Sequence, residues 1–162
     1  TIMAPESRAF VPQEQFRAHP QFLDPARTLT LWHYSRMDDP RVRWGRNFIQ
    51  LLEDGKTDQK MKFGVRNTRR WAGCWTNGVL FIKSFGYFPE ATYPDFGSNC
   101  ELFTMPGFLE LESLGPLTSL APGETLSHEE IWHVWPVTDM PTDDAELASA
   151  IQPYVEQLVM PG

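Results

Sequence analysis

The segment Phe108-Leu109-Glu110-Leu111-Glu112-Ser113 alternates leucine with glutamate, and this alternation predicts a β-strand. Successive side chains of a strand point to opposite faces, so Glu110 and Glu112 are expected on one face and Leu109 and Leu111 on the other. Acidic residues are depleted in strands, so two on one face require an explanation. Two explanations stay open: the glutamates line a polar concavity that faces a ligand, or they lie on a solvated face of the sheet.

Short apolar runs separated by turn residues predict a mainly antiparallel β-structure for most of the chain. Asn77-Gly78, the dipeptide favoured in type I′ turns, predicts a hairpin between Trp71–Trp75 and Val79–Lys83. Asp54-Gly55 predicts a second, more loosely spaced hairpin between Phe48–Leu52 and Met61–Val65. The remaining predicted strand segments are Phe48–Leu52, Met61–Val65, Ile2–Phe10, Arg27–Tyr34, Leu117–Leu120 and Thr125–Trp135, the last two joined by a turn over Ala121–Glu124.

The C-terminal segment has a helical pattern instead. Asp143 and Glu146 have the spacing of a capping box, with Asp143 as the N-cap. Apolar residues then recur at helical intervals, at Leu147, Ile151, Tyr154 and Leu158. Pro153 is expected to kink or split this helix. The sequence therefore predicts an antiparallel β-sandwich over residues 1–140 and a short helical segment over residues 141–162 that packs on the sheet.

Bulk composition limits the classes of function. The chain has 162 residues, which suffices for one domain with a hydrophobic core. Its formal net charge of -7 argues against a nucleic-acid surface. No apolar run approaches the roughly 20 residues that a membrane span needs, so we expect no membrane partner. Cys74 and Cys100 are expected to be two buried thiols, with a disulfide as the alternative.

Motifs for common catalytic chemistries are missing from the sequence, which contains no phosphate-binding glycine loop, no nucleophile-elbow serine and no paired CxxC. Ser127, His128 and Glu129 do not form a recognisable triad pattern. His128 and Glu130 would share one face of a strand and could ligate a metal with a third group, while His133 would point the other way. No third ligand stands out, and we expect neither a metal nor a cofactor.

Aromatic and basic residues offer further candidates for binding. Tryptophan faces can stack on sugar C–H surfaces, although most of the six tryptophans are expected in the core; they are Trp32, Trp44, Trp71, Trp75, Trp132 and Trp135. Two short basic runs are expected to be solvated loop charges, with an anionic ligand as the alternative; they comprise Arg41, Arg43, Arg46, Arg66, Arg69 and Arg70.

Several stretches together resemble a known family. The run YPDFGSNCELFTMPGFLELESLGPLTSLAPGETLSHEEIW, at positions 93–132, resembles the C-terminal part of uncharacterised proteins in the galactose mutarotase-like (aldose 1-epimerase-like) superfamily. Upstream, LTLWHYSRMDDPR, MKFGVRNTRRW and VLFIKSF resemble the middle segments of the same group, in the same order. The resemblance covers roughly residues 1–135 and is looser toward the true mutarotases.

The resemblance implies a large antiparallel supersandwich with a concave sugar-binding face. In mutarotases a glutamate late in the chain takes the proton of the anomeric hydroxyl, a histidine protonates the ring oxygen, and the ring opens. By motif position Glu112 is similar to that glutamate, with Glu110 beside it. A carboxylate next to a second carboxylate in a half-buried cleft is also physically suited to proton transfer.

Further residues are expected to line the wall of the ligand site. They are Glu101, Lys62, Trp71 and Lys83, with His33 as the nearest candidate for the acid, although its position does not clearly match the family's histidine. Lys83 lies in an apolar strand, where a buried lysine would need a carboxylate partner. The alternative for Lys62 and Lys83 is protection of an edge strand.

The expected partner is a small sugar or sugar derivative. Two other functions remain open at this point, a non-catalytic carbohydrate-binding module and a structural half-domain of a larger assembly. The resemblance covers only the C-terminal portion of the family's domain. Half of a sandwich would leave sheet edges and an apolar face open, which favours a homodimer or pairing with an N-terminal half.

Overall fold

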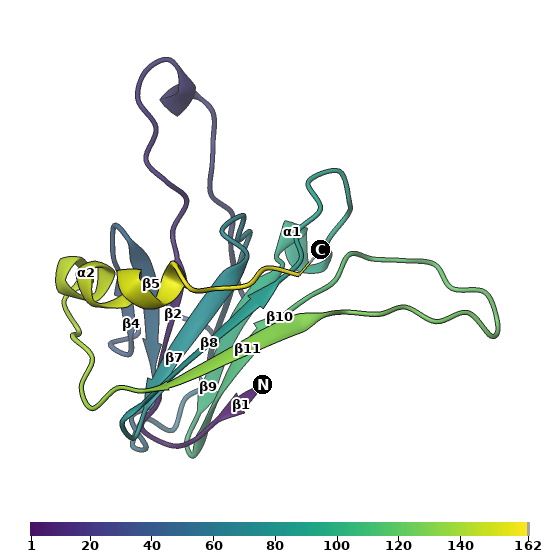
Figure 1. The fold of residues 1–162 in the computed structure, drawn as a ribbon. Coiled ribbons are helices and arrows are strands. Elements are labelled where there is room, and N and C mark those ends of the chain that lie inside the picture. The colour runs from purple at the N-terminus through teal and green to yellow at the C-terminus, as the bar shows by residue number, and fades with distance from the viewer. Residues whose placement is uncertain (162) are drawn as a thin grey trace.

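Two antiparallel sheets pack face to face in the computed structural model, which describes residues 1–161 except for the side chain of Phe22 (Figure 1). The five-stranded sheet has the order β1 (Ile2–Met3), β10 (Phe108–Ser113), β9 (Cys100–Met105), β6 (Met61–Val65) and β3 (Leu29–Leu31). The six-stranded sheet has the order β11 (Glu130–Pro136), β8 (Val79–Phe85), β7 (Trp71–Thr76), β2 (Arg8–Pro12), β5 (Phe48–Leu52) and β4 (Val42–Trp44). The predicted mainly β-sandwich with a short C-terminal helix is confirmed.

The main core lies between the two sheets. Inward-facing residues alternate along each strand, as they do in β9, where Cys100 and Leu102 are fully buried. The largest contributions come from aromatic and aliphatic side chains of both sheets, including Phe63, Phe81, Phe85, Leu51, Leu109 and Leu111. Across residues 1–161, no helix is long and apolar enough to cross a membrane.

The hairpin predicted at Asn77-Gly78 is confirmed. Strands β7 and β8 pair antiparallel, with Trp71 opposite Ser84 at one end and Thr76 opposite Val79 at the other. Asn77 and Gly78 have positive φ angles of 48° and 76°, as both central residues of a type I′ turn must.

The hairpin predicted at Asp54-Gly55 is wrong, because β5 and β6 belong to different sheets. Asp54 does form a local turn, in which its carboxylate accepts hydrogen bonds from the backbone N–H groups of Lys56 and Thr57. The chain then continues to the opposite sheet, where Met61 begins β6.

Four other predicted strand segments also differ in the structure. Ile2–Phe10 is divided into β1 and β2, which lie in different sheets, and Arg27–Tyr34 contains only the short β3. Leu117–Leu120 forms no strand, and β11 begins at Glu130 rather than at Thr125. The intervening residues 114–129 extend away from the sandwich as a long arm (Figure 1).

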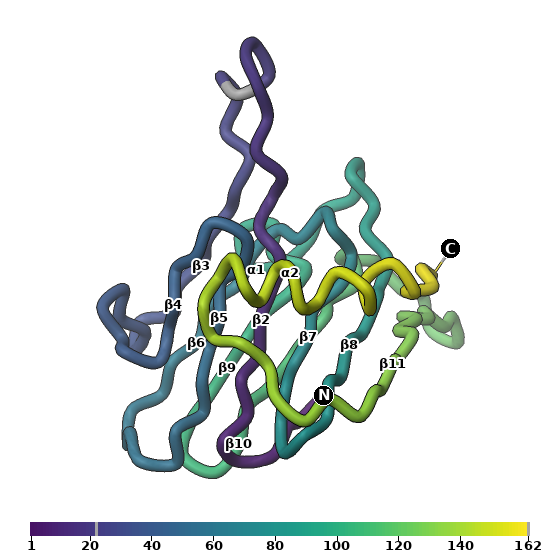
Figure 2. Tube along the Cα trace, turned by 60° about the vertical axis from the view of Figure 1, so that its left-hand side comes forward, coloured from purple at the N-terminus to yellow at the C-terminus, as the bar shows by residue number. Residues whose placement is uncertain are grey.

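Helix α2 (Asp144–Val155) covers the outer face of the six-stranded sheet (Figure 2). Asp143 caps it as predicted, accepting hydrogen bonds from the N–H groups of Ala145 and Glu146 at 2.9 and 3.0 Å. Leu147 and Ile151 are buried, in agreement with the predicted periodicity. Pro153 does not split the helix, which ends two residues later. Gly162, the last residue of the predicted helical segment, lies outside the described residues.

Two short helical turns complete the fold. The 3-10 turn η1 (Gln21–Leu23) lies within the loop of residues 13–28, which rises from the sandwich between β2 and β3 (Figure 2). The turn α1 (Pro94–Gly97) lies between β8 and β9. It contains two residues with positive φ, Asp95 at 50° and Phe96 at 59°.

The structure confirms the predicted burial of the cysteines but not the predictions for the tryptophans and for one arginine. Cys74 and Cys100 are both free and buried, as expected. The expectation that most tryptophans are core residues is wrong: in the part of the chain that the structure describes, Trp71 is buried, and Trp75 and Trp135 pack half-buried against the same cluster. Arg41 is not a solvated loop charge, because it is buried against Asp39 with an N–O distance of 2.8 Å.

Candidate functional site

The outer face of the five-stranded sheet carries a cluster of four charged residues, which we call the acid–lysine cluster: Lys62, Glu101, Glu110 and Glu112. The strand register brings them together, because Glu112 is paired with Glu101 and Phe103 is paired with both Glu110 and Lys62. Leu109 and Leu111 are fully buried on the other face. The predicted division of this strand into an acidic and an apolar face is therefore confirmed.

The ammonium group of Lys62 is at the centre of the cluster. Its Nζ atom lies 2.7 Å from a carboxylate oxygen of Glu101 and 2.9 Å from one of Glu112. The same atom lies over the ring of Trp32, 4.7 Å from the ring centroid. The side chain of Glu101 is 2% exposed and that of Glu112 is 27% exposed. Glu112 can therefore be reached from solvent, whereas Glu101 is covered.

The carboxyl groups of the cluster differ in their pKa. Burial raises the pKa of Glu101 to about 7, and its contacts with Lys62 only partly oppose that rise. Burial and the neighbouring Glu112 raise the pKa of Glu110. Burial also acts to raise the pKa of Glu112, but its hydrogen bonds with Glu110 and Lys62 outweigh burial and hold that pKa below its usual value. Glu112 is thus the carboxylate that stays ionised, beside Glu110, which holds a proton more readily.

A glycine lets the α1 turn approach the sheet beside this cluster. Gly64 is the register partner of both Glu101 and Thr30. A Cβ atom at Gly64 would lie 2.6 Å from Ser98 Oγ, so a larger residue would displace Ser98. Ser98 in turn donates a hydrogen bond to the carbonyl of Asp95 at 2.9 Å, which holds the turn in place.

The turn presents an unusual exposed aromatic residue. Phe96 is 91% exposed, and both it and Asp95 adopt left-handed backbone conformations that are uncommon for residues other than glycine. Such strained residues persist where the surrounding structure holds them, and they cluster at binding sites.

A cavity of about 350 Å³ lies between the α1 turn and β3. Its lining consists of Thr30, Leu31, Trp32, His33, Asp95 and Phe96. Two of these residues connect it to the acid–lysine cluster: Trp32 lies against Lys62, and the carboxyl group of Asp95 contributes to the raised pKa of Glu101. Glu110 and Glu112 are not part of this lining. The cavity and the cluster are therefore adjacent, with the lysine between them.

The structure brings together most, but not all, of the residues that sequence reasoning selected. Glu110, Glu112, Glu101 and Lys62 form one cluster, and His33 is exposed at the neighbouring cavity. Trp71 lies elsewhere, because it faces α2 from the outer face of the six-stranded sheet.

Lys83 also lies away from the cluster, between the two sheets. Its Nζ atom donates hydrogen bonds to Glu130 Oε1 and to the carbonyl of Leu111, both at 2.7 Å. The predicted carboxylate partner of this buried lysine is therefore confirmed. The alternative prediction, that Lys62 and Lys83 protect an edge strand, is wrong, because β6 and β8 each have a neighbouring strand on both sides.

Sequence reasoning missed Asp95 and Phe96. Their motif, Tyr93-Pro94-Asp95-Phe96-Gly97, predicts a turn through its proline and glycine, but it does not reveal that two non-glycine residues take positive φ. Tyr34 was also missed. Its ring packs edge-on against Phe103, at a centroid distance of 6.4 Å, next to the cluster. The alternation of Thr30, Trp32 and Tyr34 was the signal that could have placed these side chains on one face.

The candidate metal ligands have a different role. His128 Nε2 lies 2.7 Å from Ser113 Oγ, and the same hydroxyl makes a short hydrogen bond with Glu130. His133 points the other way, stacking on Trp135. Within residues 1–161, no group of three or more His, Cys, Asp or Glu side chains is arranged to hold a metal ion.

Comparison of this chain with protein-family models, with curated proteins and with solved structures gives no match. The mutarotase-like resemblance therefore stays a prediction.

Proposed function

We propose that this protein binds a small sugar on the outer face of the five-stranded sheet and interconverts its anomers, as aldose 1-epimerases do. The observation that carries the proposal is the adjacency of an ionised, solvent-accessible carboxylate, Glu112, to a cavity with an aromatic wall. The cavity volume of about 350 Å³ falls within the range of small-molecule sites.

The chemical properties of the cavity wall support a sugar as the ligand. Trp32 and Phe96 offer flat apolar faces, on which the C–H surface of a pyranose can stack. Asp95 and His33 offer polar groups that can hydrogen-bond to hydroxyls. A wall of aromatic faces and a few polar groups suits a neutral polyhydroxylated ring better than a fully apolar ligand.

In the proposed reaction Glu112 acts as the general base. Its carboxylate takes the proton from the anomeric hydroxyl, the C1–O5 bond breaks, and the ring oxygen accepts a proton from a donor on the other side of the sugar. His33 is our candidate for that donor, because it lies at the cavity and is exposed. Rotation about C1–C2 and the reverse proton transfers then close the ring as the other anomer.

Lys62 positions the base in this scheme. Its ammonium holds both Glu112 and the covered Glu101, and it rests on Trp32, so one side chain fixes the base relative to the aromatic wall. Proton transfer by a positioned side chain typically contributes roughly 10²–10⁴-fold to a rate.

The test is the rate of anomeric interconversion of several aldoses, followed by polarimetry or NMR. The unmodified chain should accelerate the reaction for at least one aldose. Glu112→Gln should lower that rate by roughly 10²–10⁴-fold, whereas Glu129→Gln, an exposed glutamate outside the cluster, should leave it unchanged. An equal rate in Glu112→Gln would remove Glu112 from the role of base.

A non-catalytic carbohydrate-binding module is the second candidate. The observation that favours it is that Glu110 and Glu112 do not line the cavity, while Glu112 is engaged by Lys62. Saturable sugar binding without acceleration of anomerisation would support the binding module against the epimerase. Absence of both binding and acceleration across the aldoses would contradict both candidates.

A further inference from the structure

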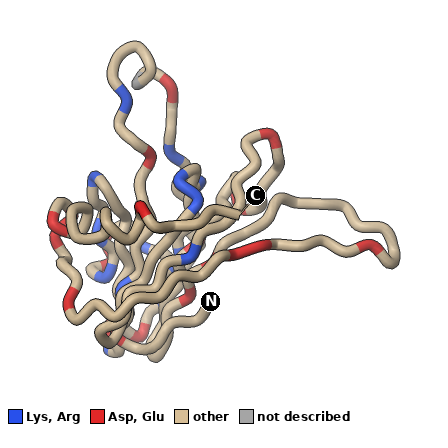
Figure 3. The backbone as a smooth tube through the Cα atoms, viewed as in Figure 1, with Lys and Arg blue, Asp and Glu red and all other residues tan. Residues whose placement is uncertain are grey.

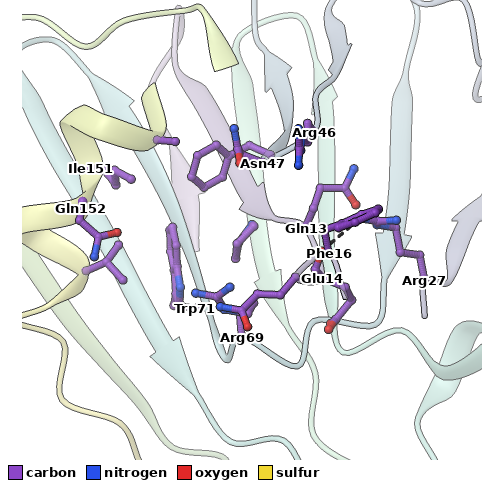
Figure 4. Close-up of a pocket in the computed structure, with 15 residues that line it drawn as sticks. Gln13, Glu14, Phe16, Arg27, Arg46, Asn47, Arg69, Trp71, Ile151 and Gln152 are labelled. Atoms are coloured by element: carbon purple, nitrogen blue, oxygen red, sulfur yellow. Dashed lines mark hydrogen bonds between the residues drawn. The ribbon is translucent and has the colours of Figure 1, made fainter. Parts of the chain in front are cut away.

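We infer that a second site, on the opposite sheet, binds a small molecule bearing a phosphate-monoester group. The site is a cavity of about 470 Å³ between helix α2, the start of the 13–28 loop and the end of β2 (Figure 4). It does not rest on the proposed sugar chemistry, because its lining shares no residue with the acid–lysine cluster or the cavity beside it.

Three arginines from separate parts of the chain line this second cavity. Arg27 comes from the loop before β3, Arg46 from the turn between β4 and β5, and Arg69 from the connection between β6 and β7. Figure 4 shows Arg46 and Arg69 approaching the cavity from different sides. Figure 3 shows basic residues gathered at the foot of the 13–28 loop, in a chain whose net charge is -7.

Among residues 1–161, none of the three guanidinium groups forms an ion pair with a carboxylate. Arg27 donates to the backbone carbonyl of Glu14, and Arg46 lies over the ring of Phe16 at 5.7 Å. In the same part of the chain, Arg69 donates its backbone N–H to the side chain of Asn67, and its guanidinium forms no ion pair. Guanidinium donors therefore remain available to an anion.

The one carboxylate in the lining does not cancel this charge. Glu14 accepts hydrogen bonds from the hydroxyl and the backbone N–H of Thr68, at 2.7 and 3.1 Å. With three arginines and one glutamate the lining keeps a net positive charge. A phosphate monoester carries about -1.5 to -2 at neutral pH, and its oxygens match the forked donors of arginine.

The rest of the lining selects an organic body rather than a bare ion. Trp71 is buried at 3% exposure, and Ile151 and Val155 of α2 add aliphatic surface. An apolar wall with convergent charged groups is the usual composition of a small-molecule site. The phosphate of such an ester would bind the arginines, and a flat apolar body would contact the apolar wall. Under this proposal, Arg46 and Arg69 bind an anionic ligand, which was the alternative to solvated loop charges.

The test measures binding of phenyl phosphate by isothermal titration calorimetry, with phenol as the uncharged control. Phenyl phosphate should bind saturably and phenol should not. Arg69→Gln should weaken binding about tenfold, the effect expected for loss of a charge-assisted hydrogen bond. Arg36→Gln is the matched control, since Arg36 is exposed and paired with Asp38, and it should change the affinity less than about twofold.

Circular dichroism would verify that each variant is folded, and Arg46→Gln replaces Arg69→Gln if the latter is not. Two results would overturn the inference. One is the lack of saturable phenyl phosphate binding to the unmodified chain at millimolar concentration. The other is an equal loss of affinity in Arg36→Gln and in the cavity variant, which would indicate nonspecific attraction of the anion to positive charge.

Discussion

Replacing Lys62 by methionine is expected to destabilise the fold by an amount that grows with pH. Lys62 is the counter-ion of Glu101, whose side chain is 2% exposed. Burial raises the pKa of Glu101 to about 7 in the folded chain, well above its unfolded value of about 4.5. Without the ammonium the ionised form loses its partner, so the pKa of Glu101 in the variant should rise further.

The size of the effect follows from linkage. Below pH 7 Glu101 is largely protonated in both proteins, so the substitution removes the ion pair of Lys62 with the ionised Glu112, its remaining hydrogen bonds and its packing, which together we put at about 1 kcal/mol. Above pH 7 the unmodified chain can ionise Glu101 and the variant cannot. The free-energy difference should then grow by about 1.4 kcal/mol for each pH unit. The cost at pH 8 should therefore exceed the cost at pH 6 by about that amount.

Urea unfolding monitored by tryptophan fluorescence at pH 6 and pH 8 would measure both free energies. Lys60→Met, which removes an exposed lysine next to β6, should change neither value by more than about 0.5 kcal/mol. Lys62→Met combined with Glu101→Gln should lose the pH-dependent part, since the titrating group is gone. A cost for Lys62→Met that is equal at both pH values would refute the coupling between Lys62 and Glu101.

Three further predictions concern the rest of the fold. Burial acts to raise the pKa of Glu130, but hydrogen bonds from Lys83, Ser113 and Trp132 outweigh it and lower that pKa to about 2. After allowance for solvent screening, the ionised carboxylate should contribute about 2 kcal/mol of stability at neutral pH, which is lost as pH falls from 4.5 through 2. Acid unfolding of Glu130→Gln should lack that loss. Leu147→Ala, at a fully buried helix position, should cost about 2–5 kcal/mol in urea unfolding. Burial raises the pKa of Cys74 and Cys100 to about 12, so a thiol reagent at pH 8 should label neither until the chain is unfolded.

The sequence predicted those parts of the fold whose signals are local. Asn77-Gly78 determines both the turn and the pairing, because a two-residue loop forces its flanking strands together. Asp54-Gly55 indicates only a turn, and the longer connection around it carries the chain into the other sheet. Which sheet a strand joins depends on contacts between distant segments, and no local pattern reports them.

The candidate site shows the same limit. Alternation alone placed Glu110 and Glu112 on one face, and the structure confirms it. The contacts of Lys62 with Glu101 and with Trp32 depend on how β9, β6 and the segment after β3 are arranged side by side. The exposed Phe96 depends on a left-handed backbone conformation that its residue type disfavours, so no propensity predicts it.

The position of Lys83 has a mechanical consequence for the sandwich. Its side chain leaves one sheet and ends on a carbonyl of the other, at Leu111, while Glu130 balances its charge. Shear of the two layers by one residue step, about 3.3 Å, would break these bonds and leave an ammonium ion in an apolar interior. The layers are therefore fixed in their lateral offset, and they should separate in a single cooperative opening rather than by gradual sliding.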